Sequence, residues 1–287
     1  MDSNQNKIKW NLIDGIFIGS QSIVAGKIPT FIEWDRSLSD LTRPTFYSHG
    51  DMFGDIKTPY EQSYGLLFES YGIVPNYYKQ IKKFEDRFKY IFTYHPRLLS
   101  ENPNKYKFIP AYGIWIGGTH DAGKIEIATK TKLLSIIASD KRWTPLQEWR
   151  QQCAQFIKRE NLGDSYGKSV DNPIASTYEG LAPYMFSIVS ENIAIDNYFT
   201  EKILNCFAVG TIPVYIGCRN INQFFNSDGI IYPPINCKSQ EEFKTFVQTL
   251  TSDLYESKKS AIIDNYNRCL EFEIVEDYLY RKYNAIL

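Results

Sequence analysis

The sequence has few of the residues that build disulfide frameworks and metal centres. Its 287 residues include five cysteines, an odd number with no Cys-x-x-Cys pair, and three histidines, none in the spacing of metal ligands. This pattern indicates neither a disulfide scaffold nor a zinc site. Buried, reduced thiols are the simplest interpretation of the cysteines. The sequence therefore predicts no catalytic metal.

Charge of one sign and long apolar runs are also lacking. Lys and Arg number 32 against 33 Asp and Glu, without the basic excess that sequence-independent binding to nucleic acid usually needs. No stretch approaches the roughly 18–20 apolar residues of a membrane helix. The polar start, residues 1–10, has no apolar core of a signal peptide. We therefore expect no nucleic-acid partner, no transmembrane segment and a cytoplasmic location.

Aromatic residues, by contrast, are plentiful at 15% of the chain, with 21 tyrosines. Tyrosine-rich clefts suit sugars, because the rings stack on apolar sugar faces while the hydroxyls meet polar edges. The same rings often fill a core. Both interpretations stay open at this point.

Short apolar runs separated by polar turns predict alternating strands and helices in both halves of the chain. In the first half we expect strands at 13–18, 45–47, 64–68, 89–93 and 107–109, and a helix at 77–88. In the second half we expect strands at 133–138, 184–189, 212–216 and 229–232, and helices at 146–159, 199–209, 239–250 and 254–284. This alternation is typical of α/β domains.

The length favours two domains. A segment rich in glycine and charged residues, 117–132, indicates where they divide. We expect an N-terminal acceptor domain at 1–130 and a C-terminal donor domain at 131–287, and the last helix, 274–285, could pack back on the first domain.

The most informative stretch is 184–217, which is predicted to form a strand, a polar turn, a helix and a second strand. Ligands of open α/β sheets bind beyond the carboxyl ends of the strands. At that edge Glu201 could accept hydrogen bonds from ribose hydroxyls and Lys202 could meet a phosphate. Alternatively, Glu201 only complements the helix dipole and Lys202 is a solvated surface charge. Spacing alone leaves the two interpretations about even.

This stretch resembles the C-terminal signature of the alpha-1,3/1,4-fucosyltransferases, glycosyltransferase family 10. The family pattern runs Phe-Glu-Asn, a polar loop, Tyr-Val-Thr-Glu-Lys, an apolar helix and a Pro-Val strand that ends in Gly. Here it stands as Ser190-Glu191-Asn192, Tyr198-Phe199-Thr200-Glu201-Lys202 and Ile212-Pro213-Val214 to Gly217, with Ser190 in place of the usual Phe. Upstream, three features are also similar to the family: Ala138-Ser139-Asp140, a helix bearing Arg150, and Asp164-Ser165-Tyr166-Gly167. The resemblance covers the C-terminal half, and none is traceable residue by residue in the N-terminal half.

The resemblance implies two Rossmann-like α/β domains facing a cleft, the GT-B type. It also implies an inverting fucosyltransferase-like enzyme that transfers a sugar, with GDP-fucose as the expected donor, to a glycan hydroxyl. In the implied donor site, Arg150 and Lys202 hold the diphosphate, Glu201 the ribose, and Glu191, Asn192 and Tyr198 line the donor. The structural alternative for Arg150 is a surface ion pair with a neighbour such as Glu148.

The sequence also has no Asp-x-Asp triplet, the paired carboxylates with which many glycosyltransferases hold a metal on the diphosphate. Arg, Lys and helix N-termini can neutralise a leaving diphosphate in their place. We therefore expect a metal-independent displacement and no obligatory cofactor other than the nucleotide sugar.

Inverting transfer needs a group that takes the acceptor's proton. Acids and histidines at predicted strand ends of the first domain are the candidates: Glu69, Asp51, His49 and His95. We choose Glu69, because it directly follows an apolar strand and because the resembled family is understood to use a glutamate from this domain. Each candidate could instead be a capping acid or a core histidine. His120, in the glycine-rich segment, could reach the cleft or be a solvated loop residue, and we favour the latter.

Two other functions remain as alternatives. A non-catalytic carbohydrate- or nucleotide-sugar-binding protein could keep this fold after losing its base. A DNA-binding protein that uses the helix at 146–159 for recognition is disfavoured by the charge balance.

Overall fold

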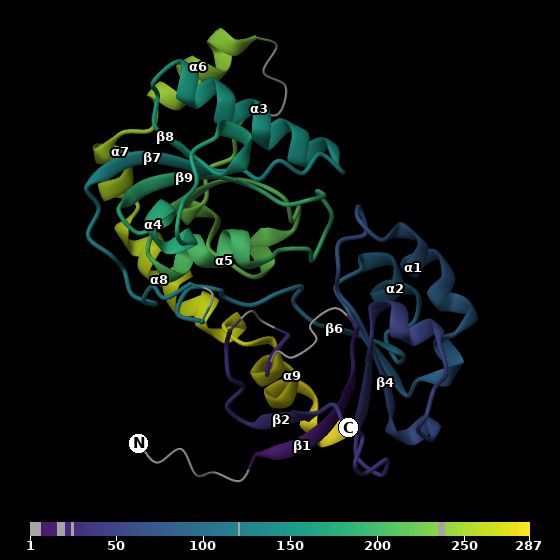
Figure 1. Cartoon of the computed structure of the whole chain (residues 1–287). Helices are drawn as coiled ribbons and strands as arrows, with labels where there is room; N and C mark the ends of the chain where they lie inside the picture. The colour runs from purple at the N-terminus through teal and green to yellow at the C-terminus, as the bar shows by residue number, and fades with distance from the viewer. Residues whose placement is uncertain (1–6, 16–20, 24–25, 120, 235–238) are drawn as a thin grey trace.

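The computed structural model describes residues 7–15, 21–23, 26–119, 121–234 and 239–287, which form two lobes, each with its own sheet (Figure 1). The first sheet has the order β2-β1-β3-β4-β5-β6, from β1 (Ile8–Ile13), β2 (Ile32–Asp35), β3 (Thr45–Ser48), β4 (Ser63–Leu67), β5 (Tyr90–Thr93) and β6 (Tyr106–Phe108). The second has the order β10-β9-β7-β8, from β7 (Lys132–Ile137), β8 (Asp164–Tyr166), β9 (Tyr184–Ser190) and β10 (Ile212–Ile216). All these strand pairs are parallel, so the α/β prediction is confirmed.

The first sheet forms the N-terminal lobe around an aromatic core. Every residue of β3 and β4 is buried, as expected of central parallel strands that are covered on both faces. The rings of Trp10 and Phe46 lie 5.3 Å apart, and those of Phe46 and Tyr64 lie 5.2 Å apart. Helices α1 (Pro75–Gln80) and α2 (Pro96–Glu101) follow β4 and β5. Each begins with proline, whose missing N–H would have no partner in the first turn.

The second sheet forms the C-terminal lobe, and most of its helices begin after a side chain that accepts a hydrogen bond from an amide of the first turn. A capping box starts α3 (Pro145–Arg159): the Thr144 hydroxyl accepts from the Gln147 amide, and the Gln147 side chain accepts from the Thr144 amide. Thr200 caps α5 (Glu201–Ala208) with its hydroxyl alone, which accepts from the Lys202 amide at 3.3 Å. The other helices of this lobe are α4 (Thr177–Leu181), α6 (Gln240–Gln248), α7 (Ser252–Ser257) and α8 (Lys259–Cys269).

The last helix, α9 (Val275–Tyr283), leaves the second lobe and lies against the first, next to β2 (Figure 1). Val275 and Leu279 are buried in the aromatic core of the N-terminal lobe. The buried Glu276 carboxylate accepts hydrogen bonds from the Ser22 hydroxyl at 2.9 Å and the Trp34 indole at 3.0 Å. The N-terminal lobe is therefore completed by the far end of the chain.

Four sequence expectations differ from the structure. The helix expected at 77–88 is α-helical only as far as Gln80, and two 3-10 turns follow it at Ile81–Lys83 and Glu85–Arg87. The helix expected at 254–284 is divided into α7, α8 and α9. One break falls at Glu273, whose carbonyl accepts from the amide of Ile114 at 3.0 Å, and at Ile274, which is extended. The strand expected at 229–232 contributes only a single bridge, between Ile231 and Val214. Of the strand expected at 13–18, residues 16–18 lie outside the described residues, and β1 begins earlier, at Ile8.

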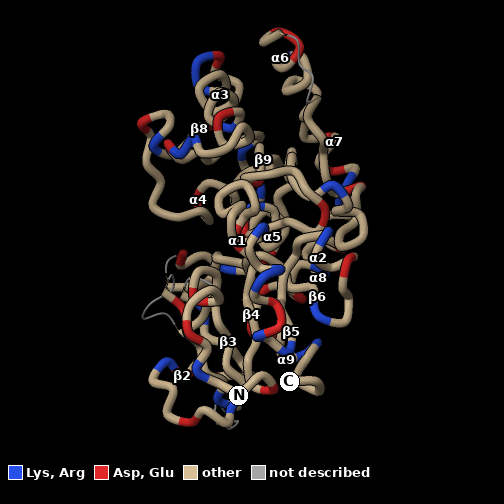
Figure 2. Tube along the Cα trace, turned by 90° about the vertical axis from the view of Figure 1, so that its right-hand side faces the viewer, with Lys and Arg blue, Asp and Glu red and all other residues tan. Residues whose placement is uncertain are grey.

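Charges of both signs are interspersed along the trace (Figure 2). Within the described residues, no helix is both long enough and apolar enough to cross a membrane.

Candidate active site

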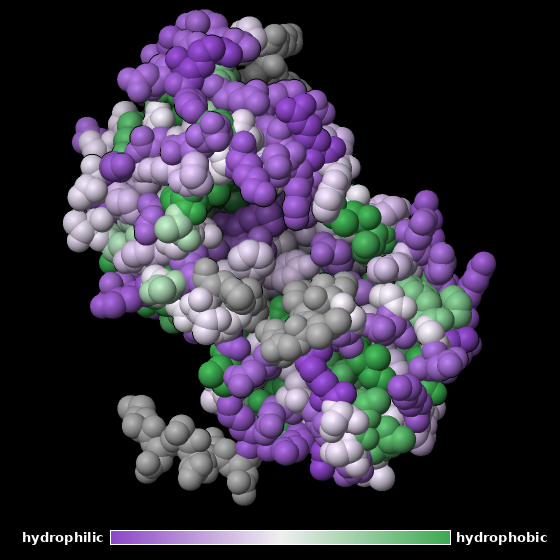
Figure 3. All heavy atoms as spheres, in the orientation of Figure 1, coloured by the Kyte–Doolittle hydropathy of each residue, from purple (hydrophilic) through white to green (hydrophobic). Residues whose placement is uncertain are grey.

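A cavity of about 550 Å³ lies between the two lobes. The space-filling view shows the surface hollowed there, with hydrophilic residues lining the visible part (Figure 3). The N-terminal lobe contributes Glu69 just beyond β4, and the second sheet contributes residues at the carboxyl ends of β7 and β9. This is where ligands bind in open parallel sheets. The lining comprises Glu69, Tyr112, Trp115, Ile137, Ser139, Lys141, Gln147, Arg150, Thr177, Leu181, Ser187, Ile188, Val189, Ser190, Asn192, Tyr198, Glu201, Lys202 and Asn205.

Six of the seven residues predicted for the site line this cavity, namely Glu69, Arg150, Asn192, Tyr198, Glu201 and Lys202. The seventh, Glu191, is fully buried behind the wall. Its carboxylate accepts from the Thr200 amide at 2.9 Å and from the Thr200 hydroxyl at 2.7 Å. Glu191 therefore supports the start of α5, whereas a direct contact with the donor was expected.

Arg150 is a buried cation on the cavity wall, 7% exposed. It projects from α3 and donates through Nη1 to the carbonyl of Ser190 at 2.8 Å, while its Nε has no hydrogen-bond partner among the described residues. Burial lowers the pKa of Arg150, although the carboxylates of Glu191 and Glu201 oppose this. Arginine nevertheless stays protonated. The cavity wall thus carries a positive charge with unused hydrogen-bonding capacity.

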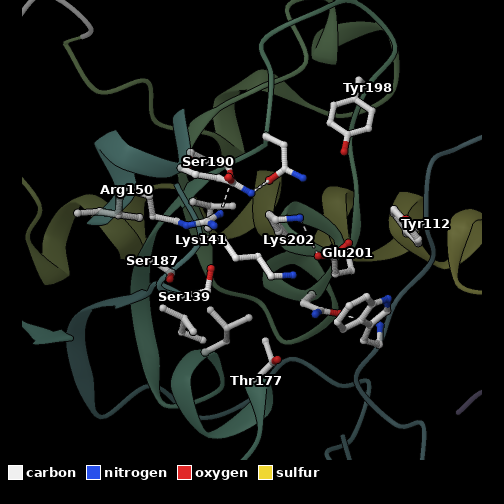
Figure 4. Close-up of a pocket in the computed structure, with 18 of the residues that line it drawn as sticks. Tyr112, Ser139, Lys141, Arg150, Thr177, Ser187, Ser190, Tyr198, Glu201 and Lys202 are labelled. Carbon is white, nitrogen blue, oxygen red and sulfur yellow. Dashed lines mark hydrogen bonds and ion pairs between the residues drawn. The ribbon is translucent and has the colours of Figure 1, made fainter. Parts of the chain in front are cut away.

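Lys202 is the second cation of the wall, at the start of α5 (Figure 4). Its ammonium lies 2.8 Å from the Glu201 carboxylate and 3.7 Å from that of Glu191. Burial alone would lower the pKa of Lys202, but these two carboxylates outweigh burial and raise it. Lys202 is therefore charged at neutral pH, held by one carboxylate in the cavity and one behind it.

Tyr198 and Asn192 come from the loop between β9 and α5. Figure 4 shows the Tyr198 hydroxyl directed toward the centre of the site, and no described residue hydrogen-bonds to it. The ring packs against Tyr94, with centroids 4.5 Å apart. Asn192 accepts from the Gln147 side chain at 3.2 Å. The buried Nε1 of Trp115 is also without a partner among the described residues.

Glu69 carries the carboxylate that the N-terminal lobe offers to the cavity. One of its oxygens accepts from the hydroxyl of Tyr112 at 2.8 Å, and the other accepts from the amide of Ser70 at 2.6 Å. These bonds orient the carboxylate and still leave lone pairs for a proton from a substrate.

The other candidate bases do not line the cavity. Asp51 accepts from the amide of Gly15 at 2.8 Å. His95 is 6% exposed and packs against the rings of Tyr71 and Tyr78. Burial lowers the pKa of His95 to about 4. His49 is wholly buried, and His120 lies outside the described residues.

The sequence analysis missed Lys141, Tyr112 and Trp115. Figure 4 shows the Lys141 side chain extending into the site between Arg150 and Lys202. Its place four residues beyond β7 is a signal that could have suggested it, because strand ends meet at the ligand edge. Tyr112 and Trp115 lie in the segment that crosses between the lobes, which carries no local motif. Within the described residues, no cluster of three or more side chains suited to metal binding occurs.

The chain matches the model of a known protein family. The model of "Glycosyltransferase family 10 (fucosyltransferase) C-term" matches residues 127–276, just over half of the chain.

Among relatives, a "putative fucosyltransferase-like protein" of Arabidopsis thaliana is 32% identical over 82 residues, 27% of this chain and 16% of the relative. The 4-galactosyl-N-acetylglucosaminide 3-alpha-L-fucosyltransferase 9 of Mus musculus is 23% identical over 214 residues, 69% of this chain and 54% of the relative. The chain thus spans about half the length of the mouse relative and about a sixth of the Arabidopsis relative.

Two solved structures share the fold. An alpha1,3-fucosyltransferase with GDP has a TM-score of 0.52 at 15% identity, with 99% of this chain and 90% of that chain covered. An alpha1,3-fucosyltransferase with GDP-fucose has a TM-score of 0.50 at 15% identity, with 84% of this chain and 79% of that chain covered. The fold is that of the GT-B glycosyltransferases, as the sequence predicted.

Proposed function

We propose that this chain, which belongs to glycosyltransferase family 10, is an enzyme. In the proposed reaction it transfers a sugar from a nucleotide-diphosphate donor to a hydroxyl of a glycan. One observation carries this proposal: a single cavity between two parallel sheets has a carboxylate, Glu69, from one lobe and the cations Arg150 and Lys202 from the other. A sugar held between them would have a proton acceptor on one side and partners for its leaving group on the other.

The donor half of the cavity suits a diphosphate. Arg150 offers an unpaired Nε, Lys202 offers an ammonium, and Lys141 adds a third cation that extends into the same space. Charge-assisted hydrogen bonds to phosphate are strong, and Arg is the residue best suited to make two of them at once. The Glu201 carboxylate lies in the same wall and can accept from ribose hydroxyls.

We propose GDP-fucose as the donor. The relatives in the family are described as fucosyltransferases, and two proteins of the same fold were solved with GDP and with GDP-fucose. What those proteins bind supports the donor class for this chain, and the acceptor glycan is left as a chemical class only.

The proposed reaction is an inverting displacement. Glu69 takes the proton of the acceptor hydroxyl while the acceptor oxygen bonds to the anomeric carbon of the sugar. The bond from that carbon to the diphosphate oxygen breaks, and the negative charge passes to the leaving diphosphate, where Arg150 and Lys202 stabilise it. Attack from the face opposite the leaving group inverts the anomeric centre. Every group in this scheme is a side chain of the cavity or part of a substrate.

A thermal-shift series tests the donor class. A ligand at 100 times its Kd stabilises the folded state by about 2.7 kcal/mol. For a chain of this size we expect a rise of about 5–10 °C in Tm with GDP-fucose or GDP. UDP-sugars at the same concentration serve as the control. No shift with GDP compounds, or an equal shift with UDP-sugars, would count against the proposed donor.

A non-catalytic binding protein is the alternative function. It would give the same thermal shift but no turnover. Release of GDP from GDP-fucose that depends on a glycan acceptor separates the two functions, because only the enzyme consumes the donor.

A further inference from the structure

Glu69 is held by a second group of buried polar residues, which does not line the cavity. His49 directly follows β3 and is 0% exposed, with its ring edge-on to Phe68 at 4.6 Å between centroids. Its backbone has a φ of +48°, in the left-handed region. His is one of the few residues besides glycine that populate this region with some frequency. The turn directs the imidazole toward the next strand end, where Glu69 lies.

The hydrogen bonds around His49 form a chain whose directions are fixed by its two ends, the Glu69 amide and the Asp14 carboxylate. The amide of Glu69 lies 3.0 Å from Nε2 of His49 and can only donate, so Nε2 is an acceptor. A neutral imidazole then carries its proton on Nδ1, which lies 2.8 Å from the Ser48 hydroxyl. The Ser48 hydroxyl in turn donates to the Asp14 carboxylate at 3.0 Å. The chain Asp14–Ser48–His49–Glu69 therefore has one self-consistent polarity.

The neutral state of His49 is consistent with its surroundings. Burial lowers the pKa of His49 to about 4, and the nearby charge of Asp14 opposes that effect only in part. A doubly protonated ring would place an N–H against the amide of Glu69, which is itself a donor.

The carbonyl of the Glu69 peptide is also fixed. The hydroxyls of Tyr78 and Tyr94 approach it at 2.5 and 3.3 Å. Together with His49 on the amide, these contacts hold both polar groups of the Glu69 main chain, while Tyr112 and Ser70 orient the carboxylate. The main chain and the side chain of this one residue are thus anchored separately.

We propose that Asp14, Ser48 and His49 form a buried relay that positions Glu69 for proton transfer, which makes His49 a positioning residue of the reaction. This inference rests on the proposed function, because it assumes that Glu69 is the base. Its physical reason is that proton transfer needs the carboxylate within hydrogen-bond reach of the acceptor hydroxyl. A strand end held on one side only would let the loop that begins at Glu69 shift.

Two substitutions of His49 test the relay. His49→Asn suits a left-handed backbone, but its side chain is too short to reach the Glu69 amide. A displacement of about 1 Å from the reacting geometry can lower a rate about 10²-fold, so we expect kcat to fall about 10- to 100-fold with the Kd for GDP-fucose unchanged. His49→Gln places a carbonyl oxygen within reach of the same amide and should recover most of the lost kcat.

Tyr47→Phe is the matched control. Tyr47 precedes Ser48 on β3, is equally buried, and hydrogen-bonds through its hydroxyl to Thr58 and to the amide of Lys57, away from Glu69. The Tyr47→Phe substitution removes buried hydrogen bonds from the same strand as His49→Asn disturbs, and it should keep the wild-type kcat. If His49→Asn, once shown to be folded, matches Tyr47→Phe in kcat while Glu69→Gln is slow, the relay is wrong and the base assignment stands. If Glu69→Gln has the wild-type kcat, the base assignment itself is wrong.

A spectroscopic measurement tests the relay without any acceptor. The sequence has only three histidines, so ¹⁵N-histidine labelling gives an interpretable spectrum. We expect the His49 ring to be neutral with its proton on Nδ1 between pH 6 and 8, because the Glu69 amide must donate to Nε2. A proton on Nε2, or a charged ring in this range, would overturn the proposal.

Discussion

Arg150→Met should separate ligand binding from stability. Arg150 is a buried cation without an ion-pair partner within 4 Å among the described residues, and its hydrogen bond goes to the Ser190 carbonyl. Burial disfavours its charged form, as the lowered pKa indicates. Removing the guanidinium ends that penalty but forfeits a charge-assisted hydrogen bond, worth about 1.5–3 kcal/mol. Since these effects oppose each other, we expect the free energy of unfolding to change little.

Donor binding should respond much more strongly to the same substitution. Loss of a preorganised donor to a developing negative charge costs about 2–4 kcal/mol, which corresponds to about 30- to 1000-fold in rate. Binding of GDP, measured by calorimetry, should weaken in the same direction, because the guanidinium already faces the diphosphate in the ground state. Arg142→Met is the matched control: Arg142 is exposed, pairs with Gln151 at 2.8 Å and does not line the cavity. Wild-type GDP affinity in folded Arg150→Met would refute the reasoning.

Three further predictions concern other residues. Glu69→Gln should leave GDP-fucose binding intact and slow transfer by about 10²–10⁴, as binding and steady-state assays would show. A wild-type rate would refute the assignment of Glu69 as the base. Lys141→Ala should weaken GDP binding less than Arg150→Met does. The loss of GDP affinity should shrink as the salt concentration is raised, because Lys141 is exposed and salt screens its charge. A loss of affinity that does not change with salt would contradict this prediction. Burial lowers the pKa of Lys130 to about 7, while its ammonium donates to the carbonyls of Ala182 and Val209. Between pH 7 and about 10, Lys130 therefore binds a proton in the unfolded chain that it lacks in the folded one, and the free energy of unfolding should rise with pH. Urea denaturation should show this rise from pH 7 to 9 in the wild type and a flatter profile in Lys130→Met.

The sequence predicted the strands that are buried on both faces better than the other elements. The strand expected at 212–216 matches β10 residue for residue, because a short apolar run between Gly210 and Gly217 has few alternatives. β8 was missed because it has only three residues, Asp164–Tyr166, with no apolar pattern. The division of the long C-terminal helix could not be predicted either, since it depends on a contact between Glu273 and Ile114, which are far apart in the sequence.

The site was predictable to the extent that a local motif defines it. The residues of the second sheet came from one stretch that resembles a family, and the structure gathers them at one edge. Glu191 does not line the cavity, because its carboxylate accepts from the amide and hydroxyl of Thr200, a contact that the motif by itself does not reveal. Tyr112, Trp115 and the contacts of His49 were not predictable, because each depends on how segments distant in sequence pack around Glu69.

The position of α9 has a consequence for building chimeric enzymes. Since Val275 and Leu279 fill the core of the N-terminal lobe and Glu276 accepts from Ser22 and Trp34, that lobe is encoded by two separate pieces of the chain. An exchange of acceptor lobes between family members that transplants only the first piece would pair one protein's helix with another protein's core. It would also leave a buried carboxylate facing foreign side chains. A workable exchange would carry both the first 112 residues and the segment from 274 onward, with junctions on either side of the crossing where Ile114 meets Glu273.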